Sequence, residues 1–220
     1  MISYKGLLDN MEMIIALIIL IFSAILHEVA HGLVADRLGD PTARLMGRLT
    51  LNPKSHIDPM MSIALPLLLL LSGSPVIFGA AKPVPVDPFN LKDGRKDMAL
   101  VALAGPLTNI LLAIFASLLI RSFLSISPSF FLSSFLYPLL SVIVTLNLLL
   151  AIFNLLPIPP LDGSKVFSLI LPEAEANAYL ALGSIGMFIL FFLLLFPIGG
   201  LSLGSLIFSL LSFSQNLLLP

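Results

Sequence analysis

The chain of 220 residues contains no cysteine and very little charge. Without cysteine it can form neither disulfides nor thiolate metal sites, and it has no cysteine nucleophile. Charged residues make up 10% of the sequence, whereas a soluble domain normally carries about 25%. The net charge is −1 and no basic stripe forms, so we expect no nucleic-acid partner. Water is therefore not the main solvent of this protein.

Long apolar runs take the place of the missing charge, and 58% of the residues are hydrophobic. Several runs reach or approach the roughly 20 residues that a helix needs to cross a bilayer. The sequence predicts a single all-α membrane domain over residues 1–220, a polytopic helical bundle with a re-entrant segment and short extended loops. No small-residue cleavage site closes the first apolar run, so we expect an integral helix there and not a removable signal.

The apolar runs and their flanking residues predict where the helices begin and end. Helices are expected at residues 8–38, 98–123, 135–156 and 176–196, with a short closing helix in the last twenty residues. Gly39 and Pro41 mark the end of the first helix. The stretch "RLTLN" at residues 48–52 could form a short strand. These elements are joined by polar connections too short to hold a second domain.

Basic residues set the expected orientation. One group lies between the first two apolar runs and another after the second: Arg37, Arg44, Arg48 and Lys54, then Lys82, Lys92, Arg95 and Lys96. If both groups face the cytoplasm, as the positive-inside rule asks, the short apolar run at 60–73 must dip into the membrane and return. The alternative, a crossing at 60–73, places one group of four charges outside. The re-entrant arrangement is preferred.

The motif "HEVAH" at residues 27–31 places ionisable side chains inside the first apolar helix. Such groups are costly at membrane depth, and they mark functional sites. His27 and His31 are four residues apart, so their imidazoles project from one helix face and can reach one tetrahedral zinc ion. Glu28 can take a proton from water at the metal without being a ligand. The motif predicts one Zn²⁺ per chain.

A hydrolytic zinc site usually has a third protein ligand, and the sequence offers few candidates. Asp162 stands out because it follows a long apolar helix that three prolines interrupt, in "NLLPIPPLDG". Irregular backbone at membrane depth lines a cavity or is buried in protein. The expected topology also puts Asp162 near the same cytoplasmic end as the HEVAH motif. The other candidates are less suitable: Asp36 on another helix face, His56 in a loop, and Glu173 and Glu175 in an expected surface turn.

"HEVAH" in one transmembrane helix and "NLLPIPPLDG" at the end of a later one resemble the paired signatures of the site-2 proteases, which are intramembrane zinc metalloproteases. The pairing is far more specific than either motif alone, and the resemblance runs from the first helix to Asp162. It implies that His27, His31 and Asp162 hold zinc, that Glu28 is the catalytic base, and that Asn154 binds or polarises the substrate. The short chain without a PDZ domain resembles the compact prokaryotic branch.

The resemblance implies regulated intramembrane proteolysis: a zinc endopeptidase in the lipid bilayer that cleaves within or near a transmembrane segment of another membrane protein. It implies a multi-pass protein of a prokaryotic plasma membrane, with its active site toward the cytoplasm. One alternative is a metallopeptidase with a glutamate as third ligand. Another is a non-catalytic membrane protein that binds or transports metal, but a transporter should carry a second ionisable cluster along its path.

Other residues receive plainer interpretations. Gly105 and Asn109 in "LAGPLTN" are expected to serve close helix packing and helix–helix hydrogen bonding. This stretch resembles a further family motif, which implies that the two residues support the metal ligands. Asn147 is expected to bond a neighbouring helix. We hypothesise that the loop around His56 folds over the site and brings this histidine near the metal. The segment "AKPVPVD" is either a stiff linker or a strand that pairs with an extended substrate.

Overall fold

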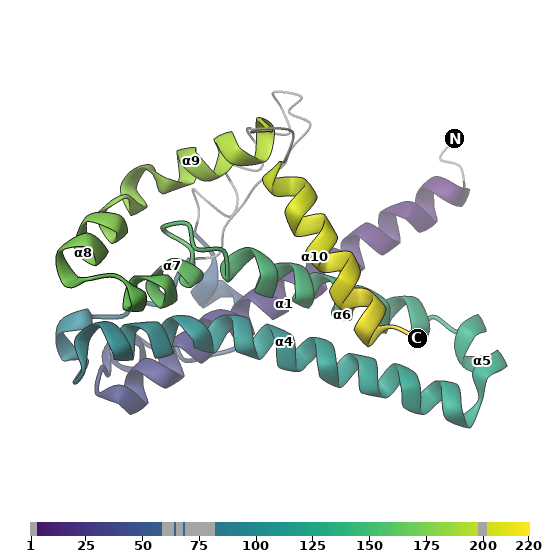
Figure 1. The fold of residues 1–220 in the computed structure, drawn as a ribbon. Coiled ribbons are helices and arrows are strands. Elements are labelled where there is room, and N and C mark those ends of the chain that lie inside the picture. The colour runs from purple at the N-terminus through teal and green to yellow at the C-terminus, as the bar shows by residue number, and fades with distance from the viewer. Residues whose placement is uncertain (1–3, 59–63, 65–67, 69–81, 198–201) are drawn as a thin grey trace.

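The computed structural model consists of α-helices and short 3₁₀ turns, with no strand in the residues that it describes, namely 4–58, 64, 68, 82–197 and 202–220 (Figure 1). The α-helices are α1 (Tyr4–Leu38), α2 (Thr42–Leu45), α4 (Gly94–Ile126), α5 (Pro128–Ser133), α6 (Leu136–Asn154), α7 (Asp162–Phe167), α8 (Glu173–Ala181), α9 (Gly183–Leu195) and α10 (Leu203–Leu218). The 3₁₀ turns are η1 (Pro53–His56), η3 (Pro88–Asn90) and η4 (Ser168–Ile170). The expected all-α fold class is confirmed.

Three helices in the described part of the chain are long and apolar enough to cross a bilayer: residues Glu12–Leu38 of α1, α4 and α6. The chain is thus a multi-pass membrane protein, as its composition predicted. The first helix ends at Leu38, where it was expected to end. Gly39 follows with a φ of +115°, a backbone conformation that glycine adopts without strain.

Helix α4 contacts both α1 and α6, and small side chains allow the close approach. Its buried small residues are Ala99, Ala102, Gly105, Ala113 and Ala116. Helices α1 and α4 run antiparallel, because Ala35 near the end of α1 packs with Val101 early in α4, whereas the earlier His27 contacts the later Asn109. The end of α1 and the start of α4 therefore lie at the same end of this helix pair. The expected re-entrant segment at 60–73 lies almost entirely outside the described residues.

Two local expectations are wrong. Residues 48–52 form a bend and irregular backbone instead of a strand: Asn52 caps η1 through the Lys54 amide, and the Thr50 carbonyl is in hydrogen-bond contact with the His56 ring. The expected single helix at 176–196 is two helices, α8 and α9, with α9 beginning at the weak helix former Gly183. The closing helix is confirmed as α10, which lies across α6 (Figure 1).

Candidate metal centre

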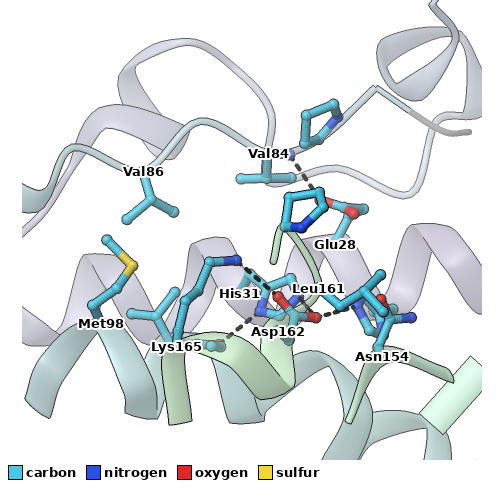
Figure 2. Close-up of a pocket in the computed structure, with 14 residues that line it drawn as sticks. Glu28, His31, Val84, Val86, Met98, Asn154, Leu161, Asp162 and Lys165 are labelled. Atoms are coloured by element: carbon cyan, nitrogen blue, oxygen red, sulfur yellow. Dashed lines mark hydrogen bonds and ion pairs between the residues drawn. The ribbon is translucent and has the colours of Figure 1, made fainter. Parts of the chain in front are cut away.

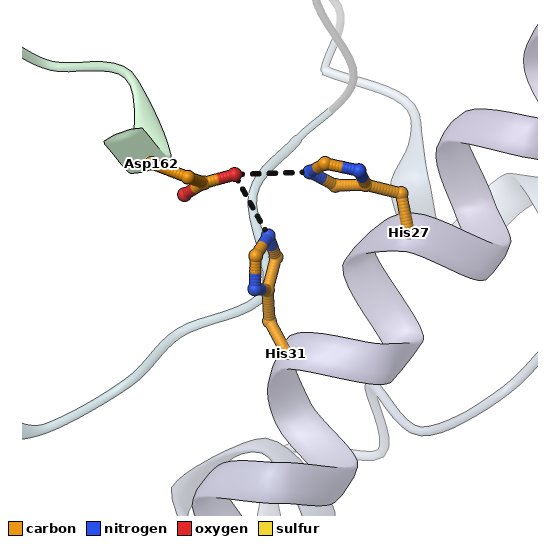
Figure 3. Close-up of side chains that lie close together, drawn as sticks. All are labelled: His27, His31 and Asp162. Atoms are coloured by element: carbon orange, nitrogen blue, oxygen red, sulfur yellow. Dashed lines mark hydrogen bonds and ion pairs between the residues drawn. The ribbon is translucent and has the colours of Figure 1, made fainter. Parts of the chain in front are cut away.

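His27 and His31 lie on successive turns of α1 and both face Asp162 (Figure 3). The Nε2 atoms of the two imidazoles are 3.1 Å and 3.2 Å from the same carboxylate oxygen, Oδ2 of Asp162. All three residues are buried, with exposed fractions of 6 to 8%. The structure thus brings together the two histidines of the HEVAH motif and an aspartate that follows them by more than 130 residues.

The turn between α6 and α7 carries Asp162 to this position. Helix α6 ends at Asn154, and the proline-rich residues that follow return the chain to α7, whose first residue is Asp162. Gly163 is required there, because a Cβ at this position would lie 2.1 Å from the carbonyl oxygen of Leu155. A larger residue would push the turn away from α6 and move the carboxylate with it.

A chain of hydrogen bonds fixes the tautomer of His27. The Asn147 amide nitrogen donates to the Ile143 carbonyl and to the Ser23 hydroxyl, so its Oδ1 faces Asn109. Asn109 donates to that oxygen over 2.8 Å and presents its own Oδ1 to Nδ1 of His27. Because Oδ1 can only accept, Nδ1 carries the proton and Nε2 keeps its lone pair.

A main-chain carbonyl holds His31 in the same tautomer. Its Nδ1 lies 2.6 Å from the Val101 carbonyl oxygen, which can only accept, so this nitrogen is also the protonated one. Two Nε2 lone pairs and a carboxylate oxygen therefore point at one another. Acceptors converge in this way where a cation lies between them, and two imidazoles with one carboxylate are a ligand set of hydrolytic zinc sites.

Gly105 leaves the space that an ion needs. A Cβ added at Gly105 would lie 2.5 Å from the Nε2 atoms of both His27 and His31, closer than van der Waals contact. The missing side chain keeps the meeting point of the lone pairs open on the α4 side. The residues present therefore fit a metal ion in both chemistry and space.

Lys165 contacts the other oxygen of the Asp162 carboxylate, with Nζ 3.1 Å from Oδ1. Burial disfavours the ionised carboxylate, whereas the positive charge of Lys165 beside it favours that form. The carboxylate is thus ionised, with Oδ1 engaged by lysine and Oδ2 directed at the histidines.

A cavity of about 360 Å³ opens beside these residues and is lined by Glu28, Asn154 and Lys165 together with apolar side chains (Figure 2). Glu28 accepts a hydrogen bond of 2.8 Å from the Val84 amide. Asn154 donates one amide hydrogen to the Leu150 carbonyl and has a second hydrogen to offer. The two side chains that the sequence analysis assigned to catalysis therefore line the same cavity as the candidate ligands.

The other candidate ligands lie elsewhere. Asp36 pairs with Arg44 at 3.0 Å, and Glu173 and Glu175 are exposed in the first turn of α8. The hypothesis for His56 is wrong: its Nε2 lies 2.8 Å from the Thr50 carbonyl oxygen within its own loop, and it does not line the cavity. In the described residues the His27, His31 and Asp162 group is the one set of side chains arranged to hold a metal.

Asn147 bonds Ser23 of α1 and Asn109 of α4, so the interhelical role predicted for it is confirmed. Asn109 contacts His27 directly, which agrees with the supporting role that the family motif implied for it. The resemblance of "LAGPLTN" to a family motif was the available signal. The Val84 amide and the Val101 carbonyl are main-chain groups, which no residue pattern reveals.

The fold and the site together define a helical membrane protein in which two histidines and one aspartate, buried beside a glutamate, could hold a metal ion. The chain belongs to peptidase family M50, whose model matches residues 15–130 and 124–197. It is a multi-pass membrane zinc metalloprotease, and the resemblance to the site-2 proteases is confirmed.

Three relatives, each provisionally named a zinc metalloprotease, show how far the similarity extends. YwhC of Bacillus subtilis is 38% identical over 186 residues, which cover 83% of this chain and 80% of YwhC. Rip2 of Mycobacterium tuberculosis is 35% identical over 172 residues, covering 78% of this chain and 62% of Rip2. MJ0611 of Methanocaldococcus jannaschii is 38% identical over 93 residues, 41% of this chain and 45% of that protein. No solved structure matches the chain.

Proposed function

We propose that this chain is an intramembrane zinc endopeptidase that hydrolyses a peptide bond within or near a transmembrane segment of another membrane protein, as in regulated intramembrane proteolysis. In this proposal His27, His31 and Asp162 hold zinc, Glu28 is the general base and Asn154 binds the substrate. The observation that carries it is the convergence of three acceptor atoms beside Glu28 in a cavity.

Bond cleavage in this cavity needs a base, an acid and a donor to the carbonyl oxygen. A bound zinc ion would supply Lewis acidity, which polarises a peptide carbonyl and makes water more acidic. Glu28 takes the proton of the attacking water as the new C–O bond forms, and it gives this proton to the amine nitrogen as the C–N bond breaks. The second amide hydrogen of Asn154 donates to the carbonyl oxygen, on which negative charge develops.

The lining of the cavity and the charges around it support a membrane substrate. Val84, Val86, Met98 and Leu161 give the cavity an apolar wall, which suits the side chains of a transmembrane segment. Basic residues flank the helix ends near the site, as the positive-inside rule requires of a cytoplasmic face. We place the site toward the cytoplasm of a prokaryotic plasma membrane. The bacterial and archaeal relatives support this placement.

Zinc content and cleavage, measured together in detergent-purified protein, test the proposal. Wild type is expected to hold about one zinc per chain and to cleave members of a panel of single-span transmembrane peptides. Asp162→Ala loses both zinc and cleavage, whereas Glu28→Ala keeps zinc and loses cleavage. Asp36→Ala is the matched control, because it removes a carboxylate from the same helix as Glu28 without touching the cavity.

Two outcomes would contradict the proposal. If Asp162→Ala binds zinc as tightly as wild type, the third ligand is a different residue. If Glu28→Ala cleaves the panel as fast as wild type, another group is the base. Zinc binding without cleavage in wild type, across peptides and across proteoliposomes that hold them, would favour a metal-binding protein.

A further inference from the structure

Residues 82–91, called the strap here, cross α1 at the turn that carries Glu28 (Figure 2). The Val84 N–H donates to Oε2 of Glu28 over 2.8 Å. Of the described residues, Val84 is the one that donates a hydrogen bond to this carboxylate. A bond between an amide and an ionised carboxylate is stronger than one between neutral groups. The strap is therefore in direct contact with the proposed catalytic base.

Buried Arg48 anchors the start of the strap. Its Nη2 donates to the carbonyl oxygens of Lys82 and Pro83, at 2.9 Å and 3.2 Å. The Lys82 amide in turn donates to the His56 carbonyl oxygen over 2.8 Å. These bonds fix the two residues that immediately precede Val84.

Asp40 anchors the other end of the strap. Its carboxylate is completely buried and accepts hydrogen bonds from the Asp87 amide, at 2.7 Å, and from the Asn90 side chain, at 3.0 Å. Asp40 lies two residues beyond the end of α1, so it ties the end of the strap to the helix that carries Glu28. An ionised group without solvent needs such donors, and the strap supplies two of them.

Gly32 lets the strap lie close to α1. It is one helical turn beyond Glu28, on the same face. A Cβ at Gly32 would lie 2.8 Å from Cγ1 of Val84 and 2.6 Å from Cδ2 of Leu49, so alanine would push both away. Glycine at this position is what allows the Val84 amide to reach the carboxylate.

We propose that the Val84 amide is a positioning group for the general base: it holds Oε2 of Glu28 in place and leaves Oε1 to receive the proton. Asp40, Arg48 and Gly32 act through the strap to keep the amide there. A glutamate side chain has several rotamers, and one strong hydrogen bond selects among them. The role of Glu28 as base rests on the proposed function, but the hydrogen bond and its anchors do not.

The proposal also distinguishes two roles of the strap, which are positioning of Glu28 and pairing with an extended substrate. Because Glu28 already binds the Val84 amide, that amide is not free to pair with an extended substrate. The Val86 amide has no hydrogen-bond partner among the described residues, and Val86 lines the cavity. Loss of the Val84 N–H should thus lower kcat, whereas any pairing of substrate with the strap would act through Val86 and change KM.

Amide exchange tests the hydrogen bond without any substrate. The full chain, zinc-loaded and labelled with ¹⁵N-valine, is studied by NMR in detergent micelles, and the Val84 signal is the one that Val84→Leu removes. We expect the Val84 amide to exchange slowly with water, and to exchange about tenfold faster or more in Glu28→Ala, while Val86 is unchanged. Equal exchange of Val84 in the two proteins overturns the proposal, whether or not the chain is a protease.

Cleavage of a panel peptide tests the positioning role. Val84→Pro removes the N–H, and Val84→Ala keeps it. We expect Val84→Pro to retain zinc and to have a kcat roughly ten- to a hundredfold below that of Val84→Ala, with a similar KM, because both variants lose the valine side chain and only Val84→Pro loses the N–H. Wild-type kcat in zinc-loaded Val84→Pro overturns the proposal.

A proline can damage the strap in other ways, so Gly32→Ala provides a second route to the same result. It leaves every hydrogen-bonding group in place and only displaces the strap from α1. Faster Val84 exchange together with a lower kcat in this variant supports the proposal. Faster exchange with wild-type kcat refutes it, because the bond would then be lost without consequence for the base.

Discussion

Replacement of Asn109 by leucine should weaken zinc binding although Asn109 does not face the cavity. Asn109 is completely buried and presents its Oδ1 to Nδ1 of His27. Leucine has a similar volume but no acceptor. His27 is then free to move its proton from Nδ1 to Nε2 and to donate to Asp162. That hydrogen bond competes directly with the metal for both ligands.

The size of the effect follows from the site. Removal of the hydrogen-bond partner of a metal-ligating histidine typically lowers metal affinity about 10- to 100-fold, or roughly 1.4 to 2.7 kcal/mol. His27 has no other partner for Nδ1 among the described residues, and its exposed fraction is 6%, so water can replace Asn109 only poorly. We therefore expect a value toward the upper end of the range.

Competition with a chromophoric zinc chelator, in detergent at constant pH, measures this affinity, and circular dichroism checks that the helices remain. Ser117→Ala is the matched control. Ser117 lies about two turns further along α4, is 2% exposed and donates to the Leu218 carbonyl. The Ser117→Ala variant also loses a buried hydrogen bond, but this bond lies far from the metal centre. If Asn109→Leu and Ser117→Ala bind zinc equally tightly, orientation of His27 by Asn109 is refuted.

Three further predictions concern single residues. Gly105→Ala should abolish zinc binding while helicity persists, because its Cβ would lie 2.5 Å from the Nε2 atoms of both histidines; full zinc content in this variant contradicts the spatial argument. Lys165→Met should retain zinc with an affinity lowered by about tenfold or less, as measured by chelator competition, since Asp162 would lose the partner of Oδ1; a complete loss of zinc would show that Lys165 does more than orient the carboxylate. Asp40 should make the free energy of unfolding fall in acid. Burial disfavours the ionised form of its carboxylate, but hydrogen bonds from Thr42, Asn90 and the Asp87 amide outweigh burial and hold the pKa of Asp40 below its usual value. A lowered folded-state pKa contributes stability that is full above about pH 4 and is lost as the pH falls through the folded-state value, so thermal unfolding followed by circular dichroism should show a weaker acid dependence in Asp40→Asn.

The sequence was informative where the relevant signal is local. The apolar runs predicted all three long helices, and the end of the first at Leu38 was correct to the residue because Gly39 and Pro41 follow it directly. His27 and His31 could be placed on one face from their spacing alone. The break in "NLLPIPPLDG" singled out Asp162, because prolines and an acidic residue at membrane depth are explained together only by a buried turn.

The sequence was uninformative where main-chain groups or long-range contacts decide the outcome. The partners of Glu28 and His31 are the Val84 amide and the Val101 carbonyl, which every residue possesses. Only the tertiary fold decides which of them meets a side chain. His56 was misplaced for a related reason: a histidine in a polar loop can satisfy one nitrogen on a nearby carbonyl, and Thr50 offers one six residues earlier.

The polar network of Ser23, Asn147, Asn109 and His27 joins α1, α4 and α6, and its value can be judged by magnitude. A hydrogen bond between transmembrane helices contributes only about 0.6 kcal/mol on average, because the separated helices also find partners for their polar groups. Orientation of a metal ligand is worth roughly 1.4 to 2.7 kcal/mol in zinc affinity. The network should therefore matter more for the metal than for helix association. Asn147→Leu tests this at a residue that reaches His27 only through Asn109. The loss in the free energy of zinc binding should exceed the loss in the free energy of unfolding of the zinc-free protein. A larger loss in unfolding than in zinc binding would assign the network to packing alone.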